Sequence, residues 1–259
     1  MEFEKIVVVE SNKDSSEHLE SSRRLREVLS GRDFCWTMYD DLSKEKLSGA
    51  DLVITLGGDG TYIEAANRIR DSYLLGINSD MTSSEGALAS LSMNERGKLE
   101  EILGGKFNVI ERQRGEVKLN DKVLDELVTN EVYVGAEKRL NTSRYIIDYR
   151  GKREEHRSSG AVISTGTGST GWFNAIGGDE FGANEKKLRF VITETYLGKR
   201  IYVPTVLRGE ILSDENISFE STRDYGGIIG IGFKTYDFNR GDVVEVKLSD
   251  KPLQSIEGI

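Results

Sequence analysis

The fold is decided by the stretch Leu52-Val-Ile-Thr-Leu-Gly-Gly-Asp-Gly-Thr-Tyr62, in which a short apolar run ends in three glycines and one aspartate. Directly after it, Tyr62, Ala65, Ala66 and Ile69 recur at the spacing of an amphipathic helix. The glycines therefore stand at a turn from a strand to a helix. Open α/β sheets bind ligands at this edge, and the unpaired amides at a helix N-terminus suit a phosphate group.

Asp59 is the unexpected residue of this turn. Glycines let the backbone approach a phosphate closely, but a carboxylate beside phosphates is repelled unless it meets a metal ion or takes a proton from a hydroxyl. We therefore expect Asp59 to act as a general base or in association with Mg²⁺. The alternative is that Asp59 only caps the helix that follows it.

Two kinds of pattern divide the chain. Over residues 1–106, short apolar runs alternate with helix-like stretches, which is typical of a parallel sheet covered by helices. Over residues 107–236, Val and Ile alternate with polar residues and helical periodicity is scarce. We expect a Rossmann-like α/β domain, then a β-rich, sandwich-like domain, with a ligand in the cleft between them. Residues 237–259 are expected to pack back on the first domain.

Composition excludes several classes of function. The 259 residues carry a net charge of -9, which argues against a nucleic-acid partner because a phosphate backbone needs a basic surface. Two histidines are too few for a histidine-based metal site or a hydrolytic triad. No apolar stretch approaches the roughly 20 residues that cross a bilayer, and the first residues show no signal or presequence, so we expect a cytoplasmic protein without a membrane partner. We expect Cys35 to be buried and His156 to lie on the surface.

A second candidate site is the run Ser164-Thr-Gly-Thr-Gly-Ser-Thr-Gly171, which follows the apolar residues 161–163. Small residues with hydroxyls can wrap a phosphate or a ribose and donate hydrogen bonds to it. Gly166, Gly168 and Gly171 match the dinucleotide pattern G-x-G-x-x-G, but that pattern needs a βαβ unit and this run lies in the β-rich half. A purely structural turn is the alternative.

Three further features are weaker by themselves. Asn130-Glu131 lies in an apolar run, where adjacent strand residues face opposite sides unless a bulge or strand end presents both. Arg157, shortly before the Gly/Ser/Thr run, could offer a cation to a phosphate. Gly177-Gly-Asp-Glu-Phe181 spells the diguanylate cyclase signature, which we interpret as a coincidence. A Walker-type phosphate loop is absent from the sequence.

Taken in order, these motifs resemble the NAD kinase family. The resemblance rests on Gly57-Gly-Asp-Gly-Thr61, Gly76-Ile-Asn78, Asn130-Glu131 and Ser164-Thr-Gly-Thr-Gly-Ser-Thr170, and it covers about residues 51–178. Details such as Ser158-Ser-Gly160 are closest to the mitochondrial-type branch of that family. The resemblance implies transfer of the γ-phosphoryl of ATP, as its Mg²⁺ complex, to the 2′-hydroxyl of the adenosine ribose of NAD, giving NADP.

The resemblance also implies roles for individual residues. Asp59 would be the catalytic carboxylate that engages the 2′-hydroxyl, Asn130 and Glu131 would hold the adenosine, and no residue is assigned as a metal ligand. Thr170 to Ala175 would contact the dinucleotide, partly across the interface of a homodimer or homotetramer. The ligand-binding residues expected in this way are Gly58, Gly60, Thr61, Asn78, Asn130, Glu131, Arg157, Ser159, Thr167, Gly168, Ser169, Thr170, Gly171, Trp172 and Ala175.

Departures from the commoner bacterial pattern concern the substrates. Ser159 replaces an Asp, Gly166 a Pro, Trp172 a Tyr and Ala175 a Ser. These departures leave open whether NADH is also phosphorylated and whether polyphosphate replaces ATP as the donor. Two alternatives remain. A lipid kinase of the diacylglycerol or sphingosine type shares the Gly-Gly-Asp-Gly loop, and a non-catalytic dinucleotide sensor would keep the fold without the transfer.

Overall fold

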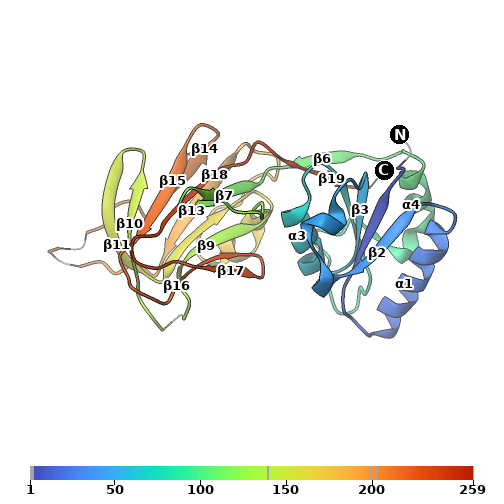
Figure 1. The fold of residues 1–259 in the computed structure, drawn as a ribbon, viewed down its shortest axis with the longest axis horizontal. Coiled ribbons are helices and arrows are strands. Elements are labelled where there is room, and N and C mark those ends of the chain that lie inside the picture. The colour runs from blue at the N-terminus through green and yellow to red at the C-terminus, as the bar shows by residue number, and fades with distance from the viewer. Residues whose placement is uncertain (1–2, 139, 199, 202, 259) are drawn as a thin grey trace. The chain divides into compact units, whose positions relative to one another are not determined.

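The computed structural model describes residues 3–138, 140–198, 200–201 and 203–258, and the chain forms two compact units (Figure 1). The first unit runs to Glu111 and takes in the chain again from Leu253, and the second unit is Arg112–Pro252. The expected boundaries, after residues 106 and 236, differ from these. The reason is strand pairing, because Val243–Leu248 pairs within the second unit and only Leu253–Ile256 pairs with a strand of the first.

The first unit is a sheet with helices on both faces. Its strands are ordered β2-β1-β3-β4-β19-β6, with β5 beside β4, and the pairs β1/β2, β1/β3, β3/β4, β4/β5 and β4/β19 are parallel. The bounds are β1 Ile6–Glu10, β2 Phe34–Met38, β3 Leu52–Gly57, β4 Tyr73–Asn78, β5 Leu91–Ser92, β6 Val109–Arg112 and β19 Leu253–Ile256. The helices are α1 Ser16–Leu29, α2 Lys44–Leu47, α3 Asp59–Arg68 and α4 Arg96–Leu103, with 3-10 turns η1 Tyr39–Asp41 and η2 Met93–Glu95.

Continuous apolar runs explain why helices cover both faces of this sheet. Every residue of β1 and β3 is buried, so their alternate side chains enter two different cores. Ile6 and Ile54 pack with Leu25 of α1 on one face, while Val53 packs with Tyr62 of α3 on the other. The α/β first domain expected from the sequence is confirmed.

The second unit is a sandwich of two antiparallel six-stranded sheets. One sheet, here called the β10 sheet, has the order β11-β10-β15-β18-β7-β8, and the other, the β9 sheet, has the order β14-β13-β12-β9-β16-β17. The strands are β7 Gly115–Leu119, β8 Lys122–Val123, β9 Glu131–Ala136, β10 Ser143–Tyr149, β11 Lys152–Ser158, β12 Gly160–Ser164, β13 Lys187–Thr193, β14 Arg208–Leu212, β15 Asn216–Ser221, β16 Gly227–Ile231, β17 Lys234–Asp237 and β18 Val243–Leu248. A 3-10 turn, η3 Gly168–Thr170, precedes the short helix α5 Trp172–Ala175.

Alternation of apolar and polar residues builds the core of the sandwich. Val132 and Val134 of β9 point inward with Ile163 of β12, and they meet Ile147 and Phe219 from the β10 sheet. Residues of the same strands with the opposite parity face outward. The β-rich, sandwich-like second domain expected from the sequence is confirmed.

Two expectations about single residues are wrong. Cys35 is exposed, because β2 is the edge strand of its sheet and turns this side chain to solvent. His156 is completely buried, because it lies on the inner face of β11 with its ring stacked on Tyr145. Its Nε2 lies 2.9 Å from Oε1 of Glu154, and burial lowers the pKa of the imidazole. None of the helices in the described part of the chain is long and apolar enough to cross a membrane.

Candidate functional site

The Gly-Gly-Asp-Gly turn joins β3 to α3, as the sequence predicts. β3 ends at Gly57, Gly58 is the N-cap of α3, and Asp59 and Gly60 are the first two residues of the helix. A Cβ on Gly57 would lie 2.4 Å from Oγ1 of Thr61, and one on Gly58 would lie 2.7 Å from Oγ of Ser84. Close packing therefore requires glycine at position 57, whereas at position 58 the nearest atom is the end of the Ser84 side chain.

The first amides of α3 remain open. Gly58 has no side chain to cap the helix, and its carbonyl accepts hydrogen bonds from the amides of Thr61 and Tyr62. Within the described residues, the amides of Asp59 and Gly60 have no hydrogen-bond acceptor. Helix N-termini of this kind carry a partial positive charge and bind phosphate groups.

The carboxylate of Asp59 is held by a neighbouring loop and not by its own helix. Oδ1 accepts a hydrogen bond from the amide of Leu88 (2.9 Å), and Oδ2 accepts one from the amide of Ala87 (3.2 Å). Asp59 therefore does not cap α3, which removes the structural alternative considered above. Because each carboxylate oxygen can accept a second hydrogen bond, an oriented acceptor remains for a hydroxyl.

Asn78 shapes the loop that holds Asp59. It ends β4, its Nδ2 donates to the carbonyl of Ser84 (2.9 Å), and its Oδ1 accepts from the amide of Asp80 (3.1 Å). Gly86 follows in the left-handed region at φ +64°, and a Cβ there would lie 2.4 Å from the Asn78 amide nitrogen. Asn78 is expected to bind the ligand, but in the structure both its Nδ2 and its Oδ1 form hydrogen bonds within the protein.

Asp80 supports the same loop and was not foreseen from the sequence. Hydroxyl groups of Ser15, Thr82 and Ser83 donate to its carboxylate, and these hydrogen bonds hold its pKa far below the ordinary value. The run Asp80-Met-Thr-Ser83 is the sequence signal that could have been used, because Asp followed by hydroxyl residues often forms such turns.

In the second unit, Asn130 and Glu131 lie at the start of β9. Asn130 immediately precedes the strand and Glu131 is its first residue, and both residues are half-buried. Oδ1 of Asn130 is buried and, within the described residues, has no hydrogen-bond donor. Glu131 is half-buried, and the loss of hydration raises the pKa of its carboxyl group to about 7.

The Gly/Ser/Thr run packs tightly against Asn130. The amide of Thr165 donates to the carbonyl of Asn130 (2.8 Å), and a Cβ on Gly168 would lie only 2.5 Å from that carbonyl oxygen. The buried hydroxyls are used internally: that of Thr165 donates to the carbonyl of Thr129, and that of Ser169 donates to Gly166. For Thr165 and Ser169 this matches the structural alternative, because their hydroxyls donate to backbone carbonyls.

The later half of the run is open to a ligand. Thr170, Gly171, Trp172 and Ala175 are exposed, with 45% of Trp172 accessible. The Trp172 ring lies 5.6 Å from the ring of Tyr133, measured between centroids. These two rings line a pocket of about 240 Å³ together with Ala136, Glu137, Ser159, Ile176, Thr193 and Glu194.

The structure thus brings Ser159 and Trp172 together and adds residues that the sequence analysis missed. The hydroxyl of Ser159 donates to the carboxylate of Glu194, and its carbonyl accepts from the hydroxyl of Tyr133 (2.7 Å). Burial raises the pKa of Tyr133 to about 12. Tyr133 could have been found, because it lies two residues after Glu131 and therefore on the same face of β9.

Arg157 and Thr167 lie apart from this pocket's lining. Arg157, on β11, lies with its Nε 3.6 Å from Oε1 of Glu155, and its carbonyl accepts from the amide of Tyr196. Thr167 accepts a hydrogen bond from Nη1 of Arg112 (3.4 Å), which makes Arg112 the cation seen beside the Gly/Ser/Thr run. Among the residues described, no group of three His, Cys, Asp or Glu side chains could hold a metal ion.

Known proteins are similar to this chain over most of its length. No family model matches the sequence. An NAD kinase of Methanosarcina acetivorans is 31% identical over 213 residues, covering 80% of this chain and 74% of the relative. A probable NADH kinase of Oryza sativa is 26% identical, covering 92% of this chain and 81% of that protein.

Solved structures with the same fold agree with this result. An NAD kinase from Archaeoglobus fulgidus in complex with ATP matches with a TM-score of 0.74 at 20% identity, covering 96% of this chain and 92% of that one. Yeast NADH kinase complexed with NADH matches with a TM-score of 0.78 at 13% identity, covering 99% and 84%. Both comparisons support an α/β domain followed by a β-rich domain.

Proposed function

The chain belongs to the NAD kinase family, and from that premise we propose that it transfers the γ-phosphoryl group of ATP to the 2′-hydroxyl of the adenosine ribose of NAD. In this step a bond forms between the ribose oxygen and the γ-phosphorus, the bond to the β,γ-bridging oxygen breaks, and ADP leaves. The hydroxyl proton needs an acceptor as the bond forms.

The observation that carries the proposal is the pairing of open amides with an oriented carboxylate at one turn. The amides of Asp59 and Gly60 can bind phosphate oxygens, and the Asp59 carboxylate, fixed by Ala87 and Leu88, can accept the ribose proton. Magnesium is proposed to arrive with ATP, because protein-bound Mg²⁺ is usually held by substrate phosphates and only one or two carboxylates. Orientation and charge neutralisation are the main demands of phosphoryl transfer.

Asn130 and Glu131 are proposed to hold the adenosine of NAD. Oδ1 of Asn130, which has no hydrogen-bond partner among the described residues, can accept a hydrogen bond from the adenine amino group. The carboxylate of Glu131 can accept hydrogen bonds from ribose hydroxyls when it is ionised, which requires a pH near or above its pKa of about 7.

The pocket lined by Tyr133 and Trp172 is proposed to take the nicotinamide end of the dinucleotide. Its two aromatic rings provide a stacking surface, and Glu194 places a carboxylate next to Ser159. Gly168 and Ser169 are proposed to support this site by positioning the neighbouring backbone, as their internal packing indicates.

A homodimer or homotetramer is proposed on the basis of exposed apolar side chains. Tyr196, Leu197, Ile201 and Val203 lie close together in the sequence and are each more than half exposed. Large apolar side chains that gather on a surface mark interaction sites. Light scattering of the purified protein tests this proposal, and a monomer at micromolar concentration would contradict it. The cytoplasmic location expected from the sequence stays a prediction.

The decisive experiment incubates the purified protein with MgATP and NAD and measures NADP through a coupled NADP-specific dehydrogenase. We expect ATP-dependent NADP formation, and the same assay with polyphosphate or NADH defines donor and acceptor. Phosphorylation of diacylglycerol or sphingosine without NADP formation would favour the lipid-kinase alternative. Binding of NAD without turnover would favour a sensor, but the family relationship supports neither alternative.

A further inference from the structure

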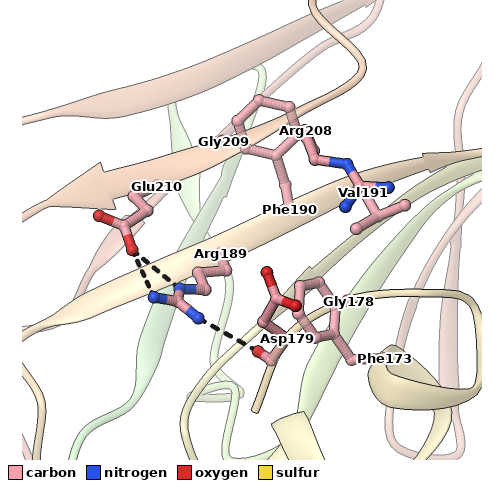
Figure 2. A pocket seen from close by; sticks show the side chains of 9 residues that line it. All are labelled: Phe173, Gly178, Asp179, Arg189, Phe190, Val191, Arg208, Gly209 and Glu210. Atoms are coloured by element: carbon pink, nitrogen blue, oxygen red, sulfur yellow. Dashed lines mark hydrogen bonds and ion pairs between the residues drawn. The ribbon is translucent and has the colours of Figure 1, made fainter. Parts of the chain in front are cut away.

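A second pocket of the sandwich lies beside the segment Gly177–Phe181, which the proposed function leaves unexplained. Its volume is about 150 Å³. Figure 2 shows its charged side chains coming from three places: Arg189 from β13, Arg208 from β14, and Asp179 from the loop facing these strands. Phe173 of α5 and Val191 of β13 provide apolar walls.

The loop that carries Asp179 is fixed on several sides. The amide of Gly178 donates to the carbonyl of Phe173 (2.9 Å), and a Cβ on Gly178 would lie 2.2 Å from the Phe173 ring. Nη1 of Arg189 donates to the carbonyl of Asp179 (3.3 Å), and the amide of Phe181 donates to the hydroxyl of Ser169 (3.1 Å). The pocket wall is therefore a built feature, and this packing explains the glycine next to Asp179.

Some charged side chains of the pocket are paired with each other, and others have few partners. Arg189 forms a two-point ion pair with Oε1 of Glu210 (2.7 and 2.9 Å), and Lys187 shares the same carboxylate. These cations hold the pKa of Glu210 below its ordinary value. The side chain of Arg208, by contrast, makes a single hydrogen bond to the described residues, from Nη1 to the carbonyl of Gly177 (3.4 Å).

Asp179 is the matching unused anion. Within the described part of the chain its carboxylate accepts no hydrogen bond and forms no ion pair, although Arg208 lines the same pocket. The pocket therefore offers one available guanidinium, one available carboxylate and an apolar wall, while Arg189 and Glu210 neutralise each other. A phosphate would be repelled by Asp179, and a metal cation by the two arginines.

We propose that this pocket binds a small zwitterion with an apolar body, of the chemical class of the aliphatic amino acids. The ammonium group would bind Asp179, the carboxylate would bind Arg208 through paired N–H donors, and the apolar part would pack on Phe173 and Val191. The volume suits such a ligand, since a cavity of about 150 Å³ holds a benzene-sized molecule and drug-sized ligands need about 300 Å³ or more.

Calorimetry of the full-length protein without NAD or ATP tests the proposal independently of kinase activity. Glycine, L-alanine, L-valine, L-leucine and L-phenylalanine are titrated in turn, and we expect saturable one-to-one binding for at least one apolar member. For that amino acid, the N-acetyl derivative lacks the ammonium group and the amide derivative lacks the carboxylate. Each derivative should bind about tenfold or more weakly, because it loses a charged hydrogen bond.

Variants locate the site. Asp179→Asn and Arg208→Gln should each weaken binding about tenfold or more. Glu180→Gln, on an exposed neighbour outside the pocket lining, and Arg144→Gln, on an exposed strand position, are matched controls that should bind like the parent. Circular dichroism verifies that each variant folds. If a variant does not fold, the affinities of the parent protein for the amino acid and its two derivatives decide whether the proposal holds. Absence of saturable binding, equal binding of the derivatives, or equal weakening by the controls would overturn the proposal.

Discussion

Replacing Glu131 by Gln should stabilise the second unit at neutral and alkaline pH. The half-buried carboxyl group of Glu131 has its pKa raised from 4.5 to about 7 by the loss of hydration. Between these values the native protein holds a proton that the unfolded chain has released, so stability falls as the pH rises and the loss is complete above pH 7. Gln is neutral at every pH and avoids this loss.

The size of the effect follows from the shift. A change in pKa from 4.5 to about 7 corresponds to about 3 kcal/mol in the free energy of unfolding. Solvent reaches part of the side chain and screens the charge, so we expect Glu131→Gln to gain about 1.5 to 3 kcal/mol over the parent at pH 8. Below pH 4.5, where Glu131 becomes protonated in both states, the gain should vanish.

Urea unfolding at pH 4.5, 6, 7 and 8 measures this difference. The chain has two tryptophans, so a Trp36→Phe background leaves Trp172 as the fluorescent reporter of the second unit. Glu155→Gln is the matched control, because the Glu155 side chain is 44% exposed. A stability difference between Glu131→Gln and its parent that stays constant from pH 4.5 to 8 would refute the assignment of a desolvated carboxyl group at this position.

Four other outcomes are expected. Asp59→Asn should lower turnover by about 10²-fold or more while calorimetric affinity for NAD changes little, and near-normal turnover would remove Asp59 from the proton-accepting role. Gly168→Ala, which places a Cβ 2.5 Å from the Asn130 carbonyl, should cost about 1–3 kcal/mol in urea unfolding, whereas Gly230→Ala, with its nearest atom at 3.9 Å, should cost less. The KM for NAD should fall as the pH rises from 6 to 8, because ionised Glu131 accepts hydrogen bonds from ribose hydroxyls. If Glu131→Gln shows the same dependence of KM on pH as the parent, Glu131 is not the group responsible. Glu194→Gln should raise the KM for NAD more than that for NADH in steady-state assays, because only the oxidised nicotinamide ring is cationic; equal increases would separate Glu194 from ring recognition.

Local signals explain what the sequence predicts well. The apolar run 52–56, the glycines after it and the 3.6-residue repeat beyond them each depend on neighbouring residues only, and together they predict β3, the turn and α3. The alternation in residues 127–134 likewise predicts an antiparallel strand with one buried face. Both domain classes follow from these periodicities without knowledge of the strand order.

Long-range contacts explain what the sequence leaves open. The amides that orient Asp59 come from Ala87 and Leu88, 28 and 29 residues later in the chain. Cys35 was expected inside because Phe34 and Trp36 flank it, but alternate strand residues face opposite sides. Phe34 and Trp36 pack against the core on one face, and Cys35 points to the other. The pairing of His156 could have been predicted, because Glu154 lies two residues before it and therefore on the same face of β11.

The Gly/Ser/Thr run shows why composition alone cannot assign ligand contacts. A hydroxyl that could donate to a phosphate can equally donate to a backbone carbonyl, and in Thr165 and Ser169 it does the latter. Gly168 meanwhile brings the run against the carbonyl of Asn130, whose side chain keeps an unused acceptor. If the proposed function is correct, the buried half of the run would act on the dinucleotide indirectly, by fixing Asn130 and Glu131, and direct contact would fall to the exposed residues from Thr170 onward.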